Sequence, residues 1–198
     1  MAKDKIKEYL TKDEVHLLLR QPDLRKIMGL RDFCILFLMV NTGLRRAEVC
    51  GLNRGSLKTA GKKIFLYILG KGGRQRKIPI RNAELLTALT RYFEKVSNLD
   101  KPEAPMFFQA KFKKAVGPQR LTHSAIRFLV ARYVKSANIQ KRITAHSLRH
   151  TFCTLALQSG ADLATVQALA GHSNISTTSR YLHTSEELME KAIDRLAL

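Results

Sequence analysis

Three short segments, far apart in the sequence, each carry a pair of polar side chains suited to a charged substrate. The pairs are Arg45 with Glu48, His146 with Arg149, and His172 with Tyr181. In the first two pairs the i,i+3 spacing places both side chains on one face of a helix. Guanidinium groups hold phosphate oxygens bidentately, and those oxygens gain negative charge in a phosphoryl-transfer transition state. The set therefore indicates chemistry at a phosphodiester.

Metal-dependent chemistry has little support in the sequence. His146 and His150 have the i,i+4 spacing of a helical zinc pair, but Arg149 lies between them, and a cation beside the metal is unfavourable. The basic stretches contain no D-x-D or D-x-E cluster of the kind that holds two Mg²⁺ ions. We therefore expect no metal and favour a covalent route with a side chain as nucleophile.

The charge of the chain favours a polyanionic partner. Its 198 residues include 35 Lys or Arg and 16 Asp or Glu, which gives a net charge of +19. Val49–Ala83 contains nine basic residues and no acid, and Ala104–Ala161 contains ten and no acid. Solvated surfaces usually mix both signs, so these stretches predict a face that binds nucleic acid, with an anionic membrane surface as the weaker alternative.

Apolar and cysteine patterns exclude several classes of protein. The longest apolar run, Phe33–Val40, has eight residues, whereas a transmembrane helix needs about 18. The polar N-terminus lacks a secretory signal, so a cytoplasmic, nucleoid-associated protein is expected. Cys34, Cys50 and Cys153 are widely spaced without a C-x-x-C pair, which predicts buried thiols rather than disulfides or zinc ligands.

Periodicity and capping signals predict a mainly α (α+β) fold. Helices are expected after the capping box at Thr11 and over residues 30–40, 46–52, 83–96, 122–137, 145–159, 163–170, 173–181 and 185–196. Residues 64–69 and 76–80 flank a glycine-rich, basic tip and predict a β-hairpin. Pro79 in the second strand indicates a sheet edge. The expected architecture is a helical domain with a small antiparallel sheet.

Four segments together resemble the tyrosine recombinase (phage integrase) family. They are Thr42–Leu52, Gly70–Arg74, His146–Phe152 and Leu169–Tyr181, in the order in which that family has them. The resemblance covers nearly all of the family's catalytic domain. It implies a helical catalytic domain with a small antiparallel β-sheet, which cleaves and rejoins DNA strands through a 3′-phosphotyrosine intermediate. It also implies that no metal and no nucleotide cofactor take part.

The resemblance also implies roles for the nucleophile and for the residues that hold the phosphate. Tyr181 would attack the scissile phosphate, and the broken strand would end in a 5′-hydroxyl. Arg45 and Arg149 would hold the non-bridging oxygens. Glu48 would help to position the region around Arg45.

The remaining catalytic roles involve proton transfer and hydrogen bonding. His146 would be the general base, and His172 would donate a hydrogen bond to the phosphate. Lys71 at the hairpin tip would protonate the leaving 5′-oxygen, with Lys62, Lys63 and Lys77 as nearby alternatives. The expected contacts with the DNA backbone are Arg46, Arg74, Arg76 and Lys77.

The resemblance divides the chain into three parts. Residues 1–10 are expected to be a linker or tail, 11–183 the catalytic DNA breaking-rejoining domain, and 184–198 a C-terminal tail helix. Most family members carry a core-binding domain before the catalytic domain, so the chain is either a catalytic fragment or a naturally single-domain member. The apolar strip Leu188, Ile193 and Leu196, with acidic neighbours, favours exchange of the tail between subunits.

The expected function is site-specific recombination or integration of DNA, as in mobile genetic elements. Double-stranded DNA is the expected partner, and the chain is expected to form tetramers on DNA but to associate weakly without it. An accessory DNA-bending protein or a separate core-binding domain is a further expected partner, and no membrane is involved. Two alternatives remain: relaxation of DNA like a type IB topoisomerase, which typically has Lys in place of His146, and a non-catalytic DNA-binding relative.

Overall fold

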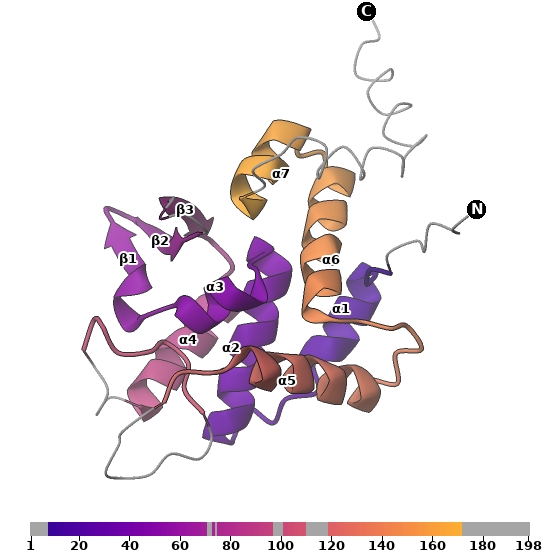
Figure 1. The fold of residues 1–198 in the computed structure, drawn as a ribbon, viewed down its shortest axis with the longest axis horizontal. Helices are drawn as coiled ribbons and strands as arrows, with labels where there is room; N and C mark the ends of the chain where they lie inside the picture. The colour runs from indigo at the N-terminus through magenta and orange to yellow at the C-terminus, as the bar shows by residue number, and fades with distance from the viewer. Residues whose placement is uncertain (1–7, 71–72, 74, 97–100, 110–118, 172–198) are drawn as a thin grey trace, which may run out of the picture.

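Seven α-helices and three β-strands make up the described part of the chain in a computed structural model (Figure 1). The described residues are 8–70, 73, 75–96, 101–109 and 119–171. The helices are α1 (Lys12–Leu19), α2 (Ile27–Thr42), α3 (Arg46–Gly51), α4 (Ala83–Lys95), α5 (His123–Ser136), α6 (Ala145–Gln158) and α7 (Leu163–Ala170). The strands are β1 (Leu57–Ala60), β2 (Lys63–Leu69) and β3 (Gln75–Ile80), preceded by a 3₁₀ turn, η1 (Arg54–Ser56). The predicted mainly helical class is confirmed.

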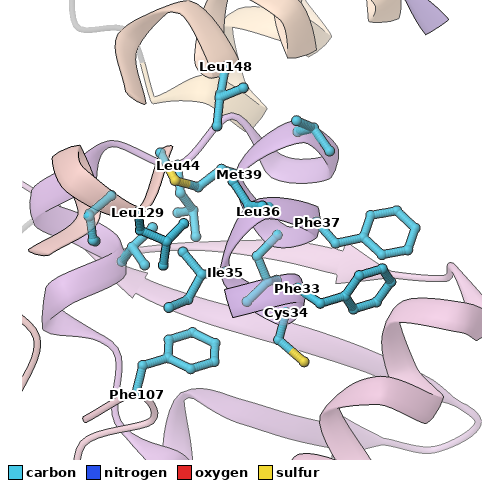
Figure 2. Packing of buried hydrophobic residues seen from close by; sticks show 14 of the residues in the cluster. Phe33, Cys34, Ile35, Leu36, Phe37, Met39, Leu44, Phe107, Leu129 and Leu148 are labelled. Carbon is cyan, nitrogen blue, oxygen red and sulfur yellow. The ribbon is translucent and has the colours of Figure 1, made fainter. Parts of the chain in front are cut away.

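Helix α2 forms the centre of the hydrophobic core. Its residues from Leu30 to Val40 are all buried, as expected for a helix with apolar side chains around its whole circumference. Figure 2 shows Phe33 and Phe37 on one side of this helix and Ile35 and Met39 on another. Helices α4 and α6 pack against it. Within the described ranges, no helix is both long and apolar enough to cross a membrane.

The small sheet is antiparallel, with the strand order β1-β2-β3. The side chains of Leu66, Ile68, Ile78 and Ile80 are buried against the helices, and their neighbours along each strand face outward. Pro79 lies in β3 at an edge of this sheet, so the hairpin and edge-strand predictions are confirmed. The sheet lies beside α3, on the side of the molecule away from α1 (Figure 1).

Gly43 determines how the chain leaves α2 and how closely α6 approaches it. This glycine has φ 61° and caps α2 in the left-handed conformation that favours glycine. A Cβ at this position would lie 2.4 Å from Cδ1 of Phe152 in α6. The missing side chain thus allows α6 to pack beside the turn that leads into α3.

The end of the predicted N-terminal linker packs on α6. Leu10 is fully buried, and its backbone N–H donates a hydrogen bond to Oγ1 of Thr151 (2.9 Å). The ring of Tyr9 meets His150 edge-on, with 5.6 Å between the ring centroids. The boundaries at residues 10 and 184 remain predictions, and the predicted helices at 173–181 and 185–196 lie outside the described residues.

A buried carboxylate connects α2 with α5. Asp32 is 1% exposed, and it accepts hydrogen bonds from Nε and Nη2 of Arg31 (2.9 and 2.6 Å). Arg132 and the hydroxyl of Tyr133 (3.0 Å) donate to its other oxygen. Arg31 also donates to the carbonyl oxygen of Phe108 (2.7 Å). This cluster therefore joins two helices and the segment before α5.

Replacing Asp32 by Asn is expected to lower the free energy of unfolding by about 3–5 kcal/mol, because it leaves the buried Arg31 guanidinium without its counter-charge. Urea denaturation followed by circular dichroism measures this change. Asp23→Asn is the matched control, since Asp23 also accepts from an arginine, Arg25, but at the surface. Equal denaturation midpoints for the two variants would contradict a stabilising role for the buried cluster.

Candidate active site

Arg45 and Glu48 form a structural unit at the start of α3. Arg45 is the N-cap residue, with extended backbone. Glu48, in the first turn, accepts hydrogen bonds from the backbone N–H of Arg45 (2.7 Å) and from its Nη1 (3.2 Å). A carboxylate at this place satisfies a free N–H of the helix and is stabilised by the helix dipole. The i,i+3 pair predicted from the sequence thus fixes the Arg45 backbone and one edge of its guanidinium.

Arg76 in β3 reaches the same carboxylate from the sheet. Its Nη1 and Nη2 donate to the two oxygens of Glu48 (2.7 and 3.0 Å), a bidentate ion pair with both partners largely buried. Its Nε donates to the carbonyl oxygen of Leu169 near the end of α7 (3.0 Å). One side chain thereby joins strand β3 to α3 and α7.

Helix α7 ends against the two arginines. The carbonyl oxygen of Gly171 accepts from Nη2 of Arg45 (2.9 Å), and Leu169 accepts from Arg76. Carbonyl groups at a helix C-terminus carry partial negative charge, which favours contact with cations. His172 follows directly in the sequence but lies outside the described residues.

Arg149 enters the site from the first turns of α6. Its side chain is 3% exposed, and Nη1 donates to the carbonyl oxygen of Gly43 (2.7 Å), two residues before Arg45. Its Nη2 is buried and has no acceptor among the described residues. Burial and the positive charge of Arg45 lower the pKa of Arg149 to about 10. The guanidinium is therefore charged at neutral pH, with a donor directed at no described oxygen.

The described part of the site has an excess of positive charge. Arg45, Arg76 and Arg149 contribute three positive charges against the single negative charge of Glu48, which leaves a net charge of +2. Burial favours a raised pKa for Glu48, but hydrogen bonds from Arg76 and the Arg45 backbone outweigh it, so the pKa is lowered. Among the described residues, no cluster of His, Cys, Asp and Glu is suited to a metal ion. The arrangement can bind an anion such as a phosphate group.

The structure places the other predicted site residues as follows. His146 is exposed in the first turn of α6, three residues before Arg149. Arg46 is exposed on α3. Lys77 lies on the outward face of β3, with Nζ 5.1 Å from the ring centroid of Phe65. The remaining predicted residues, Lys71, Arg74, His172 and Tyr181, lie outside the described residues.

Sequence reasoning did not foresee the contacts of Arg76 and Arg120. Arg76 was expected at the DNA backbone, but the structure occupies its guanidinium with Glu48 and Leu169. The alternation of β3 contained this signal, because Arg76 shares the inward face with Ile78 and Ile80. Arg120 closes the other end of α3 by donating to the carbonyl oxygens of Cys50 and Leu52 (3.0 and 2.9 Å).

Comparison with known sequences places the chain in an enzyme family. Residues 8–187 match the model of the phage integrase family. The chain is 33% identical over 186 residues to the tyrosine recombinase XerC of Myxococcus xanthus, a match that covers 92% of this chain and 60% of that protein. It is 40% identical over 179 residues to the tyrosine recombinase XerD of Lacticaseibacillus casei, which covers 90% and 59%. The chain thus spans about three fifths of these relatives.

Comparison of structures agrees with this result. The integrase of the Tn1549 transposon, solved in complex with transposon right end DNA, superimposes with a TM-score of 0.72 at 25% identity. The similarity covers 99% of this chain and 68% of that one. The resemblance inferred from the four sequence segments is confirmed, and the chain belongs to the phage integrase family of tyrosine recombinases.

Proposed function

We propose that the chain is the catalytic part of a site-specific DNA recombinase, which cleaves and rejoins strands through a 3′-phosphotyrosine intermediate. The observation that carries this proposal is the buried Arg149, whose Nη2 has no acceptor among the described residues, beside Arg45. A buried charged donor is costly unless a partner satisfies it, and a phosphodiester oxygen would be such a partner. The family membership and the net positive charge support the same substrate.

The proposed reaction exchanges one phosphodiester for another. The phenolic oxygen of Tyr181 attacks phosphorus, the bond from phosphorus to the 5′-oxygen breaks, and the 3′-phosphate remains on the tyrosine. His146 accepts the phenolic proton, and Lys71 gives a proton to the leaving 5′-oxygen. Attack by a 5′-hydroxyl reverses these steps and rejoins a strand. The phosphotyrosine link conserves the energy of the broken bond, so no ATP is required, and Arg45 and Arg149 would neutralise the charge on the phosphate oxygens in place of a metal.

The experiment that tests the proposal uses the full chain and a pool of nicked duplexes, including the ends of its source element. A nick just downstream of the cleavage site lets the short fragment that carries the new 5′-hydroxyl diffuse away, which traps the covalent complex. We expect a protein–DNA band that survives denaturation and forms in the presence of EDTA. Protease digestion followed by mass spectrometry should place the nucleotide on Tyr181. DNA that is bound but never linked covalently would overturn the proposal.

We also propose that chains assemble as tetramers on double-stranded DNA and exchange their C-terminal tails. A groove of about 610 Å³ between α1, α2 and α6 supports this assembly, because its lining combines apolar and basic side chains. Phe33, Phe37 and Phe152 supply apolar surface, and the cations Lys12 and Arg20 outnumber the single acid of the lining, Glu84. These properties complement the apolar strip and the four acids in residues 184–198. Recombination would take place in the cytoplasm on nucleoid DNA, and a DNA-bending protein or a core-binding domain would assist it.

Deleting residues 185–198 is expected to abolish tetramers on DNA while leaving binding of single chains within about threefold. Ala156→Glu in the groove should have the same effect, because it repels an acidic tail. Sedimentation of the chain with a duplex of two binding sites measures the assembly. Tetramers that form equally well without the tail would refute exchange.

A further inference from the structure

Arg76 makes more contacts between separate parts of the site than any other side chain described above. We propose that Arg76 is a positioning residue, which sets the place of the Arg45 guanidinium and of the Gly171 turn that ends α7, rather than a contact to DNA. The inference rests on the proposed function, because the group it positions is one that would hold the scissile phosphate.

The hydrogen-bond donors of Arg76 are occupied by protein acceptors. Three hydrogen bonds of Arg76, at 2.7, 3.0 and 3.0 Å, go to the two oxygens of Glu48 and to the carbonyl oxygen of Leu169. The side chain is 16% exposed, whereas that of Arg45 is 43% exposed. A phosphate approaching from solvent therefore meets Arg45 before Arg76.

Glu48 connects Arg76 to Arg45 through a series of hydrogen bonds. Glu48 accepts from Arg76 on both oxygens and from Arg45 through its backbone N–H and Nη1. Without Arg76, the carboxylate of Glu48 loses its closest counter-charge and can rotate. The Arg45 guanidinium would then lose the contact that fixes one of its edges, and an error of about 1 Å in such a group lowers the rate strongly.

Gly171 leaves space for the guanidinium of Arg76. A Cβ on this residue would lie 2.8 Å from Nη1 and 2.9 Å from Cζ of Arg76. Gly171 also has φ 68°, the left-handed conformation that ends α7. The Arg76 guanidinium thus packs directly on the turn from which the chain continues to His172. The side chain of Arg76 therefore positions both the turn at Gly171 and the guanidinium of Arg45.

The test compares Arg76→Gln, Arg76→Lys and wild type on the nicked substrate under single-turnover conditions with saturating chain. We expect cleavage by Arg76→Gln to be 10–100-fold slower, the usual range when a group that orients an active residue is lost. The dissociation constant for DNA and its dependence on salt should remain within twofold of wild type. Arg76→Lys should not restore the rate, because an ammonium group cannot hold both carboxylate oxygens and a carbonyl in one plane.

Arg91→Gln is the matched control. Arg91 is an exposed arginine of α4 that lies outside both basic stretches and makes no hydrogen bond or ion pair with the described residues of the site, so its loss removes the same charge without removing a link. Its cleavage rate should stay within twofold of wild type. In an Arg76→Gln chain, a weakened affinity with a salt slope reduced by about 1, both restored by Lys, would show a phosphate contact and overturn the inference.

Two further measurements separate positioning from a general loss of folding. The double variant Glu48→Gln, Arg76→Gln should cleave less than about threefold more slowly than Glu48→Gln alone, since both substitutions break the same ion pair. Hydrogen exchange of the Arg45 amide, which donates to Glu48, should accelerate in free Arg76→Gln while the α2 amides stay protected. Unchanged exchange and an unchanged rate would overturn the inference. A wild-type chain that forms no adduct overturns the proposed function instead.

Discussion

The Tyr181→Phe chain is expected to bind DNA as tightly as wild type and to form no covalent adduct at all. The substitution removes only the phenolic oxygen, which is the atom that would become linked to phosphorus. Binding depends mainly on the charges of Lys and Arg side chains, and the substitution leaves all of these unchanged. The expected result is complete loss of the denaturation-resistant band, with a dissociation constant within twofold of wild type.

The surroundings of the other four tyrosines in the chain support this assignment. Burial raises the pKa of Tyr92, and burial together with the charge of Asp32 raises the pKa of Tyr133 to about 12, so both phenols are poor nucleophiles. Tyr67 lies on the outward face of β2, opposite the face that carries Arg76. Tyr9 packs against His150.

Tyr67→Phe is the matched control for this experiment, because it removes a phenol from a sheet face that does not meet the arginines. It should form the adduct at the wild-type rate. Gel electrophoresis under denaturing conditions with a labelled strand measures both variants. An adduct that persists in Tyr181→Phe would show that another nucleophile acts, and the assignment of the segment from Leu169 to Tyr181 would then be wrong.

Local sequence signals were sufficient to predict the helices that position the site. The Thr11 capping box, the apolar run before Gly43 and the Gly171 end signal each depend on residues within one or two turns. The structure places the described boundaries of these helices within a few residues of the predicted ones. The pair Arg45 and Glu48 could be predicted for the same reason, since the i,i+3 spacing that brings the two side chains together lies within one turn of helix.

Contacts between residues far apart in the sequence could not be predicted from local signals. The bond between Arg149 and the carbonyl oxygen of Gly43 spans 106 residues, and it exists because Gly43 lets α6 approach α2 closely. Arg76 was grouped with DNA contacts because its charge resembles that of its neighbours, whereas its partner Glu48 lies 28 residues away. Strand β1 was missed because only Leu57 of its four residues is partly covered. Short exposed strands carry little apolar alternation.

Replacing Arg149 by Gln is expected to reduce single-turnover cleavage about 10²–10³-fold, the range for loss of one preorganised donor to a transition-state oxyanion. The reason is specific to this site. Arg149 is buried, its Nη2 has no acceptor among the described residues, and the charge of Arg45 opposes its own. Its guanidinium therefore gains more from a phosphate than an exposed arginine would, because less water must be displaced.

The same environment predicts how the cleavage rate of Arg149→Lys depends on pH. Burial and Arg45 lower the pKa of Arg149 to about 10, which keeps it charged at neutral pH, and a lysine there starts from an ordinary pKa of about 10.4. The same two effects would bring that pKa toward neutrality, so the charged form of the lysine is lost as the pH rises. The ratio of Arg149→Lys to wild-type cleavage should therefore rise as the pH is lowered from 8.5 to 6.5.

Stability of the free chain separates this role from a structural one. A buried guanidinium beside another positive charge destabilises the protein without DNA, so the unfolding midpoint of Arg149→Gln should stay at or above that of wild type. Thermal unfolding with and without a bound duplex measures the difference, and DNA should stabilise wild type more than the variant. Two results together would assign Arg149 to the packing of α6 instead of to phosphate binding. Arg149→Gln would unfold at a lower temperature than wild type, and the ratio of Arg149→Lys to wild-type cleavage would not change with pH.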